Sequence, residues 1–185
     1  MKFNEFYSLT IVHSRDIILV KGVDYMNITK QKSQKTFDKQ AADYDTNIQG
    51  EHARKLYKPI IENLKNKNIH SILDLGCGTG ALLKEIKELN IAEQLFGIDI
   101  SPNMLEIAKN KLGNDATLIL GDSERLPFED SSFDAIVCND SFHHYPQPDI
   151  VEKEVSRCLK QNGVFIIGDC WQPIGARQIM NYYMK

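Results

Sequence analysis

The sequence predicts an open α/β fold with a doubly wound, mostly parallel sheet and helices on both faces, and three observations lead to this prediction. Helical and strand-like hydrophobic patterns alternate along the chain from residue 51 onward. The strand-like segments are short and almost continuously apolar, as expected for strands buried on both faces. Unusual polar residues and glycines collect directly after these segments, where parallel sheets place their ligand sites.

The first half of this region contains two helices and two strands. Apolar residues recur at three- and four-residue steps from Ala53 to Leu64, which indicates an amphipathic helix. The run 69–75 is the first predicted strand, and a glycine loop separates it from a helical stretch at 82–89. Residues 94–100 form the second predicted strand.

The second half begins with a helix whose two ends are marked in the sequence. Ser101 can cap free backbone N–H groups, Pro102 suits the first helical position, and Gly113 suits the C-terminal end. A later helix at 149–159 begins with the spacing of a capping box. Three further strands are predicted at 117–120, 133–138 and 164–168. Strands separated by helices pair in parallel through right-handed crossovers.

Length and composition are those of one ordinary globular domain. The chain has 185 residues, of which 42% are hydrophobic and 25% are charged. A formal net charge of -3 gives no electrostatic argument for binding nucleic acid or an acidic membrane surface. No segment approaches the roughly 18 apolar residues of a membrane helix. We therefore expect no nucleic acid partner and no membrane span.

The four cysteines indicate a reducing compartment. They are far apart in the sequence and form no Cys-x-x-Cys pair; they are Cys77, Cys138, Cys158 and Cys170. Buried free thiols explain this pattern better than disulfides or a metal site. We therefore expect a cytoplasmic protein without a bound metal.

The N-terminal segment 1–25 does not continue the pattern found downstream. The codons of Lys21, Gly22 and Val23 can contain a bacterial ribosome-binding sequence directly upstream of Met26. We therefore expect residues 1–25 to be a leader outside the natural protein, or else disordered, and Met26 to be the natural start.

Glycines, acids and histidines collect at one edge of the predicted sheet, after four of its strands. They are Asp74, Gly76, Gly78 and Gly80 at the first strand, Asp99 at the second, Asp122 after the third, and Asn139, Asp140, His143 and His144 after the fourth. The loops at the opposite edge carry only turn residues. Ligands of such sheets bind beyond the carboxyl ends of the strands, so a ligand site is expected here.

The spacing of these residues favours a cationic nucleoside. Asp99 lies about 25 residues after Asp74, the offset at which a carboxylate can bind a ribose diol. The third glycine, Gly80, comes one residue earlier than in the dinucleotide pattern Gly-x-Gly-x-x-Gly. Asp74 precedes the loop, and an acid there repels phosphate but suits an ammonium or sulfonium group. The pattern therefore favours S-adenosylmethionine over NAD as the cofactor.

The chain resembles class I S-adenosylmethionine-dependent methyltransferases, in particular the small-molecule branch that includes ubiquinone- and menaquinone-type enzymes. The matching segments are ILDLGCGTG (72–80), FGIDISPNML (96–105), GDSERLPFEDSSFDAIVCNDSFHHYP (121–146) and EVSRCLKQNGVFIIGD (154–169), and FDKQAADYD (37–45) is similar to the family's N-terminal lid. The resemblance implies a Rossmann-like fold. Residues 26–50 would form a lid segment and residues 51–185 the cofactor-binding domain.

The resemblance also implies how the cofactor is held at its methionine and ribose end. Asp74 would hold the ammonium group, and Asp99 would take the ribose hydroxyls. The loop residues Gly76, Cys77, Gly78 and Gly80 would border the methionine part and the ribose and open the next helix close to the sheet. Small size alone is an alternative reason for a cysteine at position 77.

At the adenine end, the resemblance implies that Ile100 and Met104 pack on the ring. Asp122 would accept its exocyclic amine beside the backbone of Ser123, and Tyr44 of the lid would close over the methionine part. Each role has a structural alternative: Met104 can be a core residue, Asp122 can cap a turn before residue 124, and Tyr44 can be an ordinary packing residue.

The resemblance implies methyl transfer to a small molecule by in-line displacement. Asn139 would contribute backbone contacts near the transferred methyl. A general base is needed only if the acceptor must lose a proton, and His143, His144 and Asp140 lie where such a base would lie. The two histidines can also be wall residues of the site.

Two other functions compete with an active methyltransferase. One is a non-catalytic S-adenosylmethionine-binding module that needs a partner, and the other is a nicotinamide oxidoreductase. The family sheet continues past its fifth strand with a helix and an antiparallel hairpin, whereas this chain stops at Lys185. We therefore expect a truncated chain with a bare fifth-strand edge, or an oligomer or partner that covers this edge.

Overall fold

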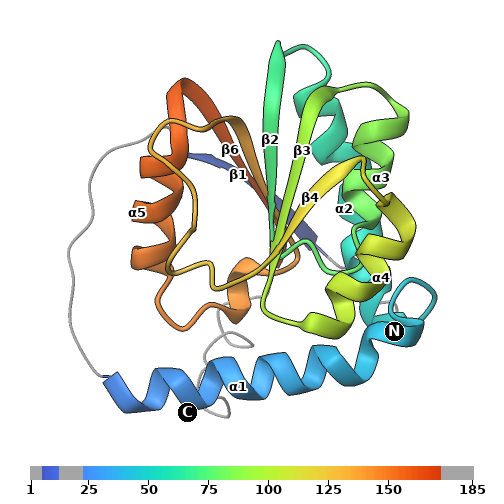
Figure 1. Cartoon of the computed structure of the whole chain (residues 1–185), viewed down its shortest axis with the longest axis vertical. Helices are drawn as coiled ribbons and strands as arrows, with labels where there is room; N and C mark the ends of the chain where they lie inside the picture. The colour runs from blue at the N-terminus through green and yellow to red at the C-terminus, as the bar shows by residue number, and fades with distance from the viewer. Residues whose placement is uncertain (1–5, 13–22, 172–185) are drawn as a thin grey trace.

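One six-stranded sheet forms the centre of the protein (Figure 1). The computed structural model describes residues 6–12 and 23–171. The strands are β1 (Phe6–Val12), β2 (Ile69–Leu75), β3 (Ala92–Asp99), β4 (Ala116–Leu120), β5 (Phe133–Asn139) and β6 (Leu159–Trp171). Their order is β1-β6-β5-β2-β3-β4, and the strands from β2 to β6 pair in parallel. The predicted doubly wound α/β fold is confirmed.

The strand order reverses between β2 and β5. The chain runs from β2 outward to β3 and β4, and then crosses back to β5 and β6 on the other side of β2. Asp74 of β2 therefore lies between Gly97 of β3 and Val137 of β5 in the register. The carboxyl ends of β2 and β5 form the switch point at which such sheets bind ligands.

Helices cover both faces of the sheet. They are α1 (Val23–Gln40), α2 (Ile48–Leu64), α3 (Ala81–Glu88), α4 (Pro102–Leu112) and α5 (Pro148–Cys158), with short 3-10 helices η1 (Ala41–Asp43) and η2 (Phe142–His144). Helices α2, α3 and α4 lie on one face and α5 on the other (Figure 1). None of the helices described is long and apolar enough to cross a membrane.

The core consists of two apolar clusters, one on each face of the sheet. Ile72 and Leu73 are adjacent in β2 and fully buried, but they belong to opposite clusters because successive strand residues point to opposite faces. Ile72 packs in the cluster with Ile60 of α2, and Leu73 packs in the cluster with Val151 of α5. The strands are therefore almost continuously apolar, as the sequence indicated.

Two helix starts can be compared with their sequence signals. The Oγ of Ser101 accepts a hydrogen bond of 3.1 Å from the backbone N–H of Met104, so the predicted cap of α4 is confirmed. The capping box predicted at residues 149–152 is wrong. Helix α5 begins at Pro148, its N-cap residue Gln147 makes no side-chain capping bond, and the proline itself suits the first helical position.

Strand β1 changes the expected outer edge of the sheet. It pairs antiparallel with β6, from Phe6 opposite Trp171 to Val12 opposite Phe165. The expectation of a bare edge beside this strand is therefore wrong, because the unpaired backbone groups of β6 are satisfied by an extended segment of the same chain. That the natural protein starts at Met26 stays a prediction. A protein that started there would lack β1, and the outer edge of β6 would then be unpaired. The helix that the family pattern places after its fifth strand falls on residues outside the described part of the chain.

Candidate functional site

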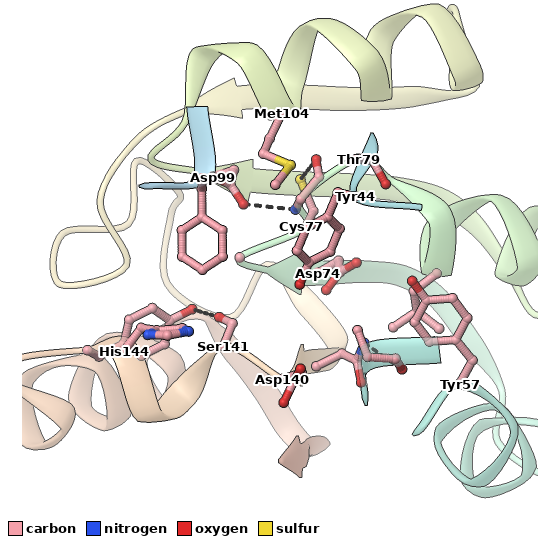
Figure 2. Close-up of a pocket in the computed structure, with 17 residues that line it drawn as sticks. Tyr44, Tyr57, Asp74, Cys77, Thr79, Asp99, Met104, Asp140, Ser141 and His144 are labelled. Atoms are coloured by element: carbon pink, nitrogen blue, oxygen red, sulfur yellow. Dashed lines mark hydrogen bonds between the residues drawn. The ribbon is translucent and has the colours of Figure 1, made fainter. Parts of the chain in front are cut away.

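A cavity lies at the carboxyl ends of β2, β3 and β5 (Figure 2). Its empty space, counted with the open mouth, is about 640 Å³. Ten of the residues predicted for the site line it: Tyr44, Asp74, Gly76, Cys77, Gly78, Asp99, Met104, Asn139, Asp140 and His144. The residues expected after the strands, and several that the family resemblance added, therefore lie around one cavity.

The three glycines of the loop after β2 adopt left-handed backbone conformations for different reasons. Their φ angles are +76° at Gly76, +51° at Gly78 and +73° at Gly80. A Cβ at Gly76 would lie 2.2 Å from the Oγ of Ser141, and one at Gly80 would lie 2.8 Å from a side-chain carbon of Leu112. A Cβ at Gly78 would meet nothing within 4 Å. The absence of a side chain at Gly78 thus leaves open space in the cavity. At Gly76 and Gly80 it lets other side chains pack closely against the loop.

Asp74 presents a buried carboxyl group to the cavity. The residue is 1% exposed, and its Oδ1 has no hydrogen-bond partner among the residues described. Burial, and then the charge of Asp99, raise its pKa to about 8. A carboxyl group in this environment lacks the donor or cation that would stabilise its ionised form. It fits the ammonium end of a ligand.

Asp99 connects the end of β3 to the glycine loop. Its Oδ2 accepts a hydrogen bond of 2.8 Å from the backbone N–H of Gly78, and its Oδ1 accepts one of 2.8 Å from that of Ser101. Burial raises the pKa of Asp99, although these backbone donors lower it. Each oxygen keeps a further lone pair, so a correctly placed carboxylate can still accept two ligand hydroxyls.

Cys77 and Met104 are both cavity-lining and buried. The Sγ of Cys77 would lie 2.8 Å from a Cβ at Gly97, so β3 approaches this side chain closely. Cys77, Cys138 and Cys158 are free and buried, as predicted, while the side chain of Cys170 lies outside the described part. Met104 is 1% exposed and therefore serves the core as well as the cavity wall.

Five predicted site residues do not line the cavity: Gly80, Ile100, Asp122, Ser123 and His143. The Oδ2 of Asp122 lies 2.6 Å from the Nζ of Lys30, and its Oδ1 accepts a hydrogen bond of 2.9 Å from the backbone N–H of Glu124. The turn-capping alternative for Asp122 is thus present in the structure. Its role at the adenine end stays a prediction.

The segment predicted as a lid lies across this edge of the sheet (Figure 1). The Oγ of Ser101 donates a hydrogen bond of 2.6 Å to Asp38, and the Nζ of Lys111 lies 2.7 Å from Asp45. Phe37 and Tyr44 from this segment line the cavity, with ring centroids 6.3 Å apart. Burial raises the pKa of Tyr44 to about 12, so its hydroxyl remains protonated.

The two histidines after β5 have different environments. The Nδ1 of His143 lies 2.6 Å from Asp169, whose other oxygen accepts a hydrogen bond of 3.0 Å from the His143 backbone N–H. Burial lowers the pKa of His143, but Asp169 and Asp140 outweigh it and raise the pKa. The His144 ring lies 3.9 Å from the His143 ring and lines the cavity. Burial, and then His143, lower the pKa of His144 to about 4.

Asn139 and Asp140 complete the floor of the cavity at the end of β5. The Nδ2 of Asn139 donates a hydrogen bond of 3.2 Å to the backbone carbonyl of Ala53 in α2. Asp140 has a φ of +53°, and its backbone N–H donates to the carbonyl of Gly168 at 2.6 Å. Burial raises the pKa of Asp140, and the charge of His143 opposes this.

Sequence reasoning missed seven residues that line the cavity: Phe37, Ala53, Tyr57, Thr79, Leu82, Ser141 and Tyr145. The hydroxyls of Ser141 and Tyr145 lie 2.6 Å apart, and both contact the carbonyl of Leu75, at 3.3 and 3.2 Å. Ser141 directly follows Asn139 and Asp140, which were predicted for the site, so its position in the sequence could have indicated that it lines the cavity. No sequence feature indicated this for Tyr57, because its helical spacing is that of a core residue.

Comparison with known proteins identifies the chain's relatives. A family model described as a methyltransferase domain matches residues 73–167. Demethylmenaquinone methyltransferase of Thermotoga maritima is 32% identical over 163 residues, which cover 85% of this chain and 71% of that protein. A sterol 4-C-methyltransferase of Caenorhabditis elegans is 35% identical over 64% of this chain and 36% of its own length.

A solved structure gives the same result at the level of the fold. It is the complex between the Haloferax volcanii Trm112 methyltransferase activator and a methyltransferase. The matched chain superposes with a TM-score of 0.63 and 28% identity over 71% of this chain and 58% of its own length. The chain thus spans between about a third and three quarters of the relatives it matches.

Proposed function

This chain belongs to the methyltransferase-domain family of S-adenosylmethionine-dependent enzymes, and from that premise we propose that it methylates a small acceptor of the quinone type. Family membership supports catalysis over a non-catalytic cofactor-binding module and over a nicotinamide oxidoreductase. The quinone-type acceptor is suggested by the name of the Thermotoga maritima relative, a demethylmenaquinone methyltransferase. A cytoplasmic location is part of the same proposal.

The observation that carries this proposal is the buried carboxyl group of Asp74 at the switch point of the sheet, whose Oδ1 has no hydrogen-bond partner among the described residues. Asp74 would hold the ammonium group of S-adenosylmethionine, and Asp99 would accept the ribose hydroxyls. The open space beside Gly78 would let the cofactor lie directly on the backbone. Ile100, Met104 and Asp122 would serve the adenine end, together with the backbone of Ser123.

Bound S-adenosylmethionine supplies a methyl group on a positively charged sulfur, so catalysis depends mainly on positioning. The chain's own residues close and orient the site. Phe37 and Tyr44 cover the cavity from the lid segment, which excludes water from the acceptor. His144 is the better candidate for receiving an acceptor proton than His143, because its ring lines the cavity and is neutral near pH 7.

Binding and turnover together test this function. We expect S-adenosylhomocysteine to bind the purified protein in calorimetric titration. We also expect tritiated methyl from S-adenosylmethionine to appear in an anaerobically reduced demethylmenaquinone analogue. Asp74→Asn should lose most of the binding, whereas the matched variant Asp115→Asn should keep it, because Asp115 is exposed and remote from the cavity. Absence of binding by the unmodified chain would refute the function, and binding without methyl transfer would favour the non-catalytic module.

A further inference from the structure

One acidic side chain of the lid segment contacts the glycine loop and α4 at the same time. The Oγ1 of Thr79 donates a hydrogen bond to one carboxylate oxygen of Asp45, and the Nζ of Lys111 lies 2.7 Å from the other. The same amine donates to the Oγ1 of Thr79 at 3.2 Å. These three residues, the Asp45 cluster, come from the lid, the loop after β2 and the last turn of α4, and each contacts both of the others.

Charge and partial burial both strengthen this cluster. Thr79 is 3% exposed, and the side chains of Lys111 and Asp45 are 18% and 40% exposed. Burial raises the pKa of Asp45, but the hydrogen bonds from Lys111 and Thr79 outweigh it and lower the pKa. Hydrogen bonds to an ionised carboxylate are about twice as strong as those between neutral groups. The cluster is therefore a substantial attachment of the lid.

Thr79 places the cluster beside the expected cofactor. It lines the cavity itself and directly follows Gly78, where a Cβ would meet nothing within 4 Å (Figure 2). The backbone N–H of Gly78 donates to Asp99, the residue expected to take the ribose hydroxyls. A cofactor that lies on Gly78 and binds Asp99 would restrict the loop, and with it the hydroxyl that Asp45 accepts.

Asp45 in turn supports the neighbouring aromatic residue of the lid. It directly follows Tyr44, which lines the cavity. The carbonyl of Tyr44 accepts a hydrogen bond of 3.2 Å from the Nη1 of Arg54, and a Cβ at Gly50 would lie 1.9 Å from the same oxygen. Helix α2 therefore holds the backbone of Tyr44 from one side, and the Asp45 cluster holds it from the other.

We propose that Asp45, Thr79 and Lys111 are positioning residues that couple the lid to the occupancy of the glycine loop. A cofactor on the loop fixes Thr79, and Thr79 together with Lys111 then holds Asp45 and its neighbour Tyr44 over the cavity. This inference rests on the proposed function and adds a coupling between its cofactor and its lid. Because such coupling is reciprocal, the closed cluster strengthens cofactor binding by the factor by which the cofactor favours closure.

The dissociation rate of S-adenosylhomocysteine from the full chain, measured by surface plasmon resonance, tests this coupling. Thr79→Val removes the hydroxyl at nearly unchanged volume, and Lys111→Met removes the cation, which lies outside the cavity. We expect each variant to raise the dissociation rate about tenfold, because a loosened lid lets the ligand leave sooner. Thr79→Ser keeps the hydroxyl and should stay within about twofold of the native rate.

Thr117→Val and Lys109→Met are the matched controls. Both residues are exposed and lie outside the cavity, so both variants should keep the native dissociation rate. The double variant of Asp45→Ala and Thr79→Val should release the ligand no faster than Asp45→Ala alone, because the two side chains act through one contact.

Hydrogen exchange of residues 37–47 distinguishes coupling from a fixed attachment. In the native chain and in Thr79→Ser, saturating S-adenosylhomocysteine should slow the exchange of these amides severalfold. In Thr79→Val and Asp45→Ala the ligand should produce little slowing. Equal slowing in the native chain and in Thr79→Val would overturn the proposal and show that the cluster holds the lid regardless of the cofactor.

The dissociation rates also separate this inference from the proposed function. Native rates in both Thr79→Val and Lys111→Met would overturn the coupling, while binding of S-adenosylhomocysteine by the unmodified chain would still support the proposed function. If Thr79→Val does not fold, Lys111→Met decides the same question. Absence of binding by the unmodified chain would overturn both.

Discussion

The amine of Lys30 in α1 lies 2.6 Å from a carboxylate oxygen of Asp122, in the loop after β4. The same amine also contacts Glu124, whose side chain accepts a hydrogen bond from Gln147. Burial lowers the pKa of Lys30, but these two acids outweigh it and raise the pKa. The lid helix is thus attached by one partly buried cation to the loop that was expected to bind adenine.

Replacing this cation should loosen the lid. With Lys30→Met, we expect the backbone amides of α1 to exchange with solvent about fivefold faster, which corresponds to losing an interaction of about 1 kcal/mol. Hydrogen exchange followed by mass spectrometry measures the effect. Lys32→Met is the matched control, because Lys32 is exposed on the same helix. Unchanged exchange in Lys30→Met would show that the ion pair does not hold the helix.

Cofactor binding should depend on pH through Asp74. Its pKa is raised to about 8 in the free protein, and a bound ammonium group favours the ionised form. Below pH 8, the ionised fraction falls about tenfold per pH unit, so the Kd of S-adenosylhomocysteine should rise by about the same factor between pH 7 and pH 6. Titrations in buffers of different ionisation enthalpy should show nearly one proton released at pH 7. A Kd independent of pH would contradict this coupling.

The same carboxyl group should reduce the stability of the free protein. A buried acid whose pKa is raised keeps its proton in the folded state while the unfolded chain ionises near pH 4. The free energy of unfolding should therefore fall as the pH rises from about 4 to about 8. Asp74→Asn removes this dependence, so we expect a variant that is more stable than the native chain at pH 7 yet binds cofactor poorly. Thermal unfolding at several pH values measures the difference, and a destabilised Asp74→Asn variant at pH 7 would contradict it.

Alanine substitutions at Gly78 and Gly80 should have different effects, one mainly on cofactor binding and the other mainly on stability. Both have positive φ, so alanine costs about 1–2 kcal/mol of backbone strain at either position. Gly80→Ala adds a clash with Leu112 and Ala108, whereas Gly78→Ala meets nothing within 4 Å. We expect Gly80→Ala to show the larger fall in Tm and Gly78→Ala the larger loss of cofactor affinity. Equal effects of both variants on the Tm and on the affinity would refute this division.

Asp169 should set the protonation of the paired histidines. In Asp169→Asn the carboxylate that raises the pKa of His143 is gone, so this pKa should fall. The pKa of His144 should fall as well, because the negative charge of Asp169 also raises that pKa directly. NMR titration of the imidazole resonances measures both values. Unchanged titration of both histidines in Asp169→Asn would contradict the prediction.

The parts of the site that sequence predicted share a local cause. Asp74, Gly78 and Asp99 lie within a few residues of strand ends. The strands themselves can be recognised in the sequence as short runs of apolar residues. Parallel strands bring their carboxyl ends together, so position after a strand translates directly into position at the cavity. Asn139 and Asp140 were found for the same reason.

The parts that sequence could not predict depend on contacts between distant segments. Lys30 and Asp122 are 92 residues apart, and their ion pair gives Asp122 a structural partner that its motif does not reveal. Tyr57 lines the cavity because α2 packs against β5 and β6 in the folded chain. Strand β1 was missed although Tyr7, Leu9 and Ile11 alternate with polar residues, because nothing in the sequence near it indicates its pairing with β6, which lies more than 140 residues later.

By itself, the sequence determined the parallel α/β order, the glycine loop and the acids that follow the strands, because these follow from hydrophobic period and short-range spacing. Only the tertiary structure decided which of those residues share a cavity, which histidine lines it and which oxygens lack a partner. Burial and hydrogen bonding are properties of the packed chain, and they depend on segments that meet only after folding.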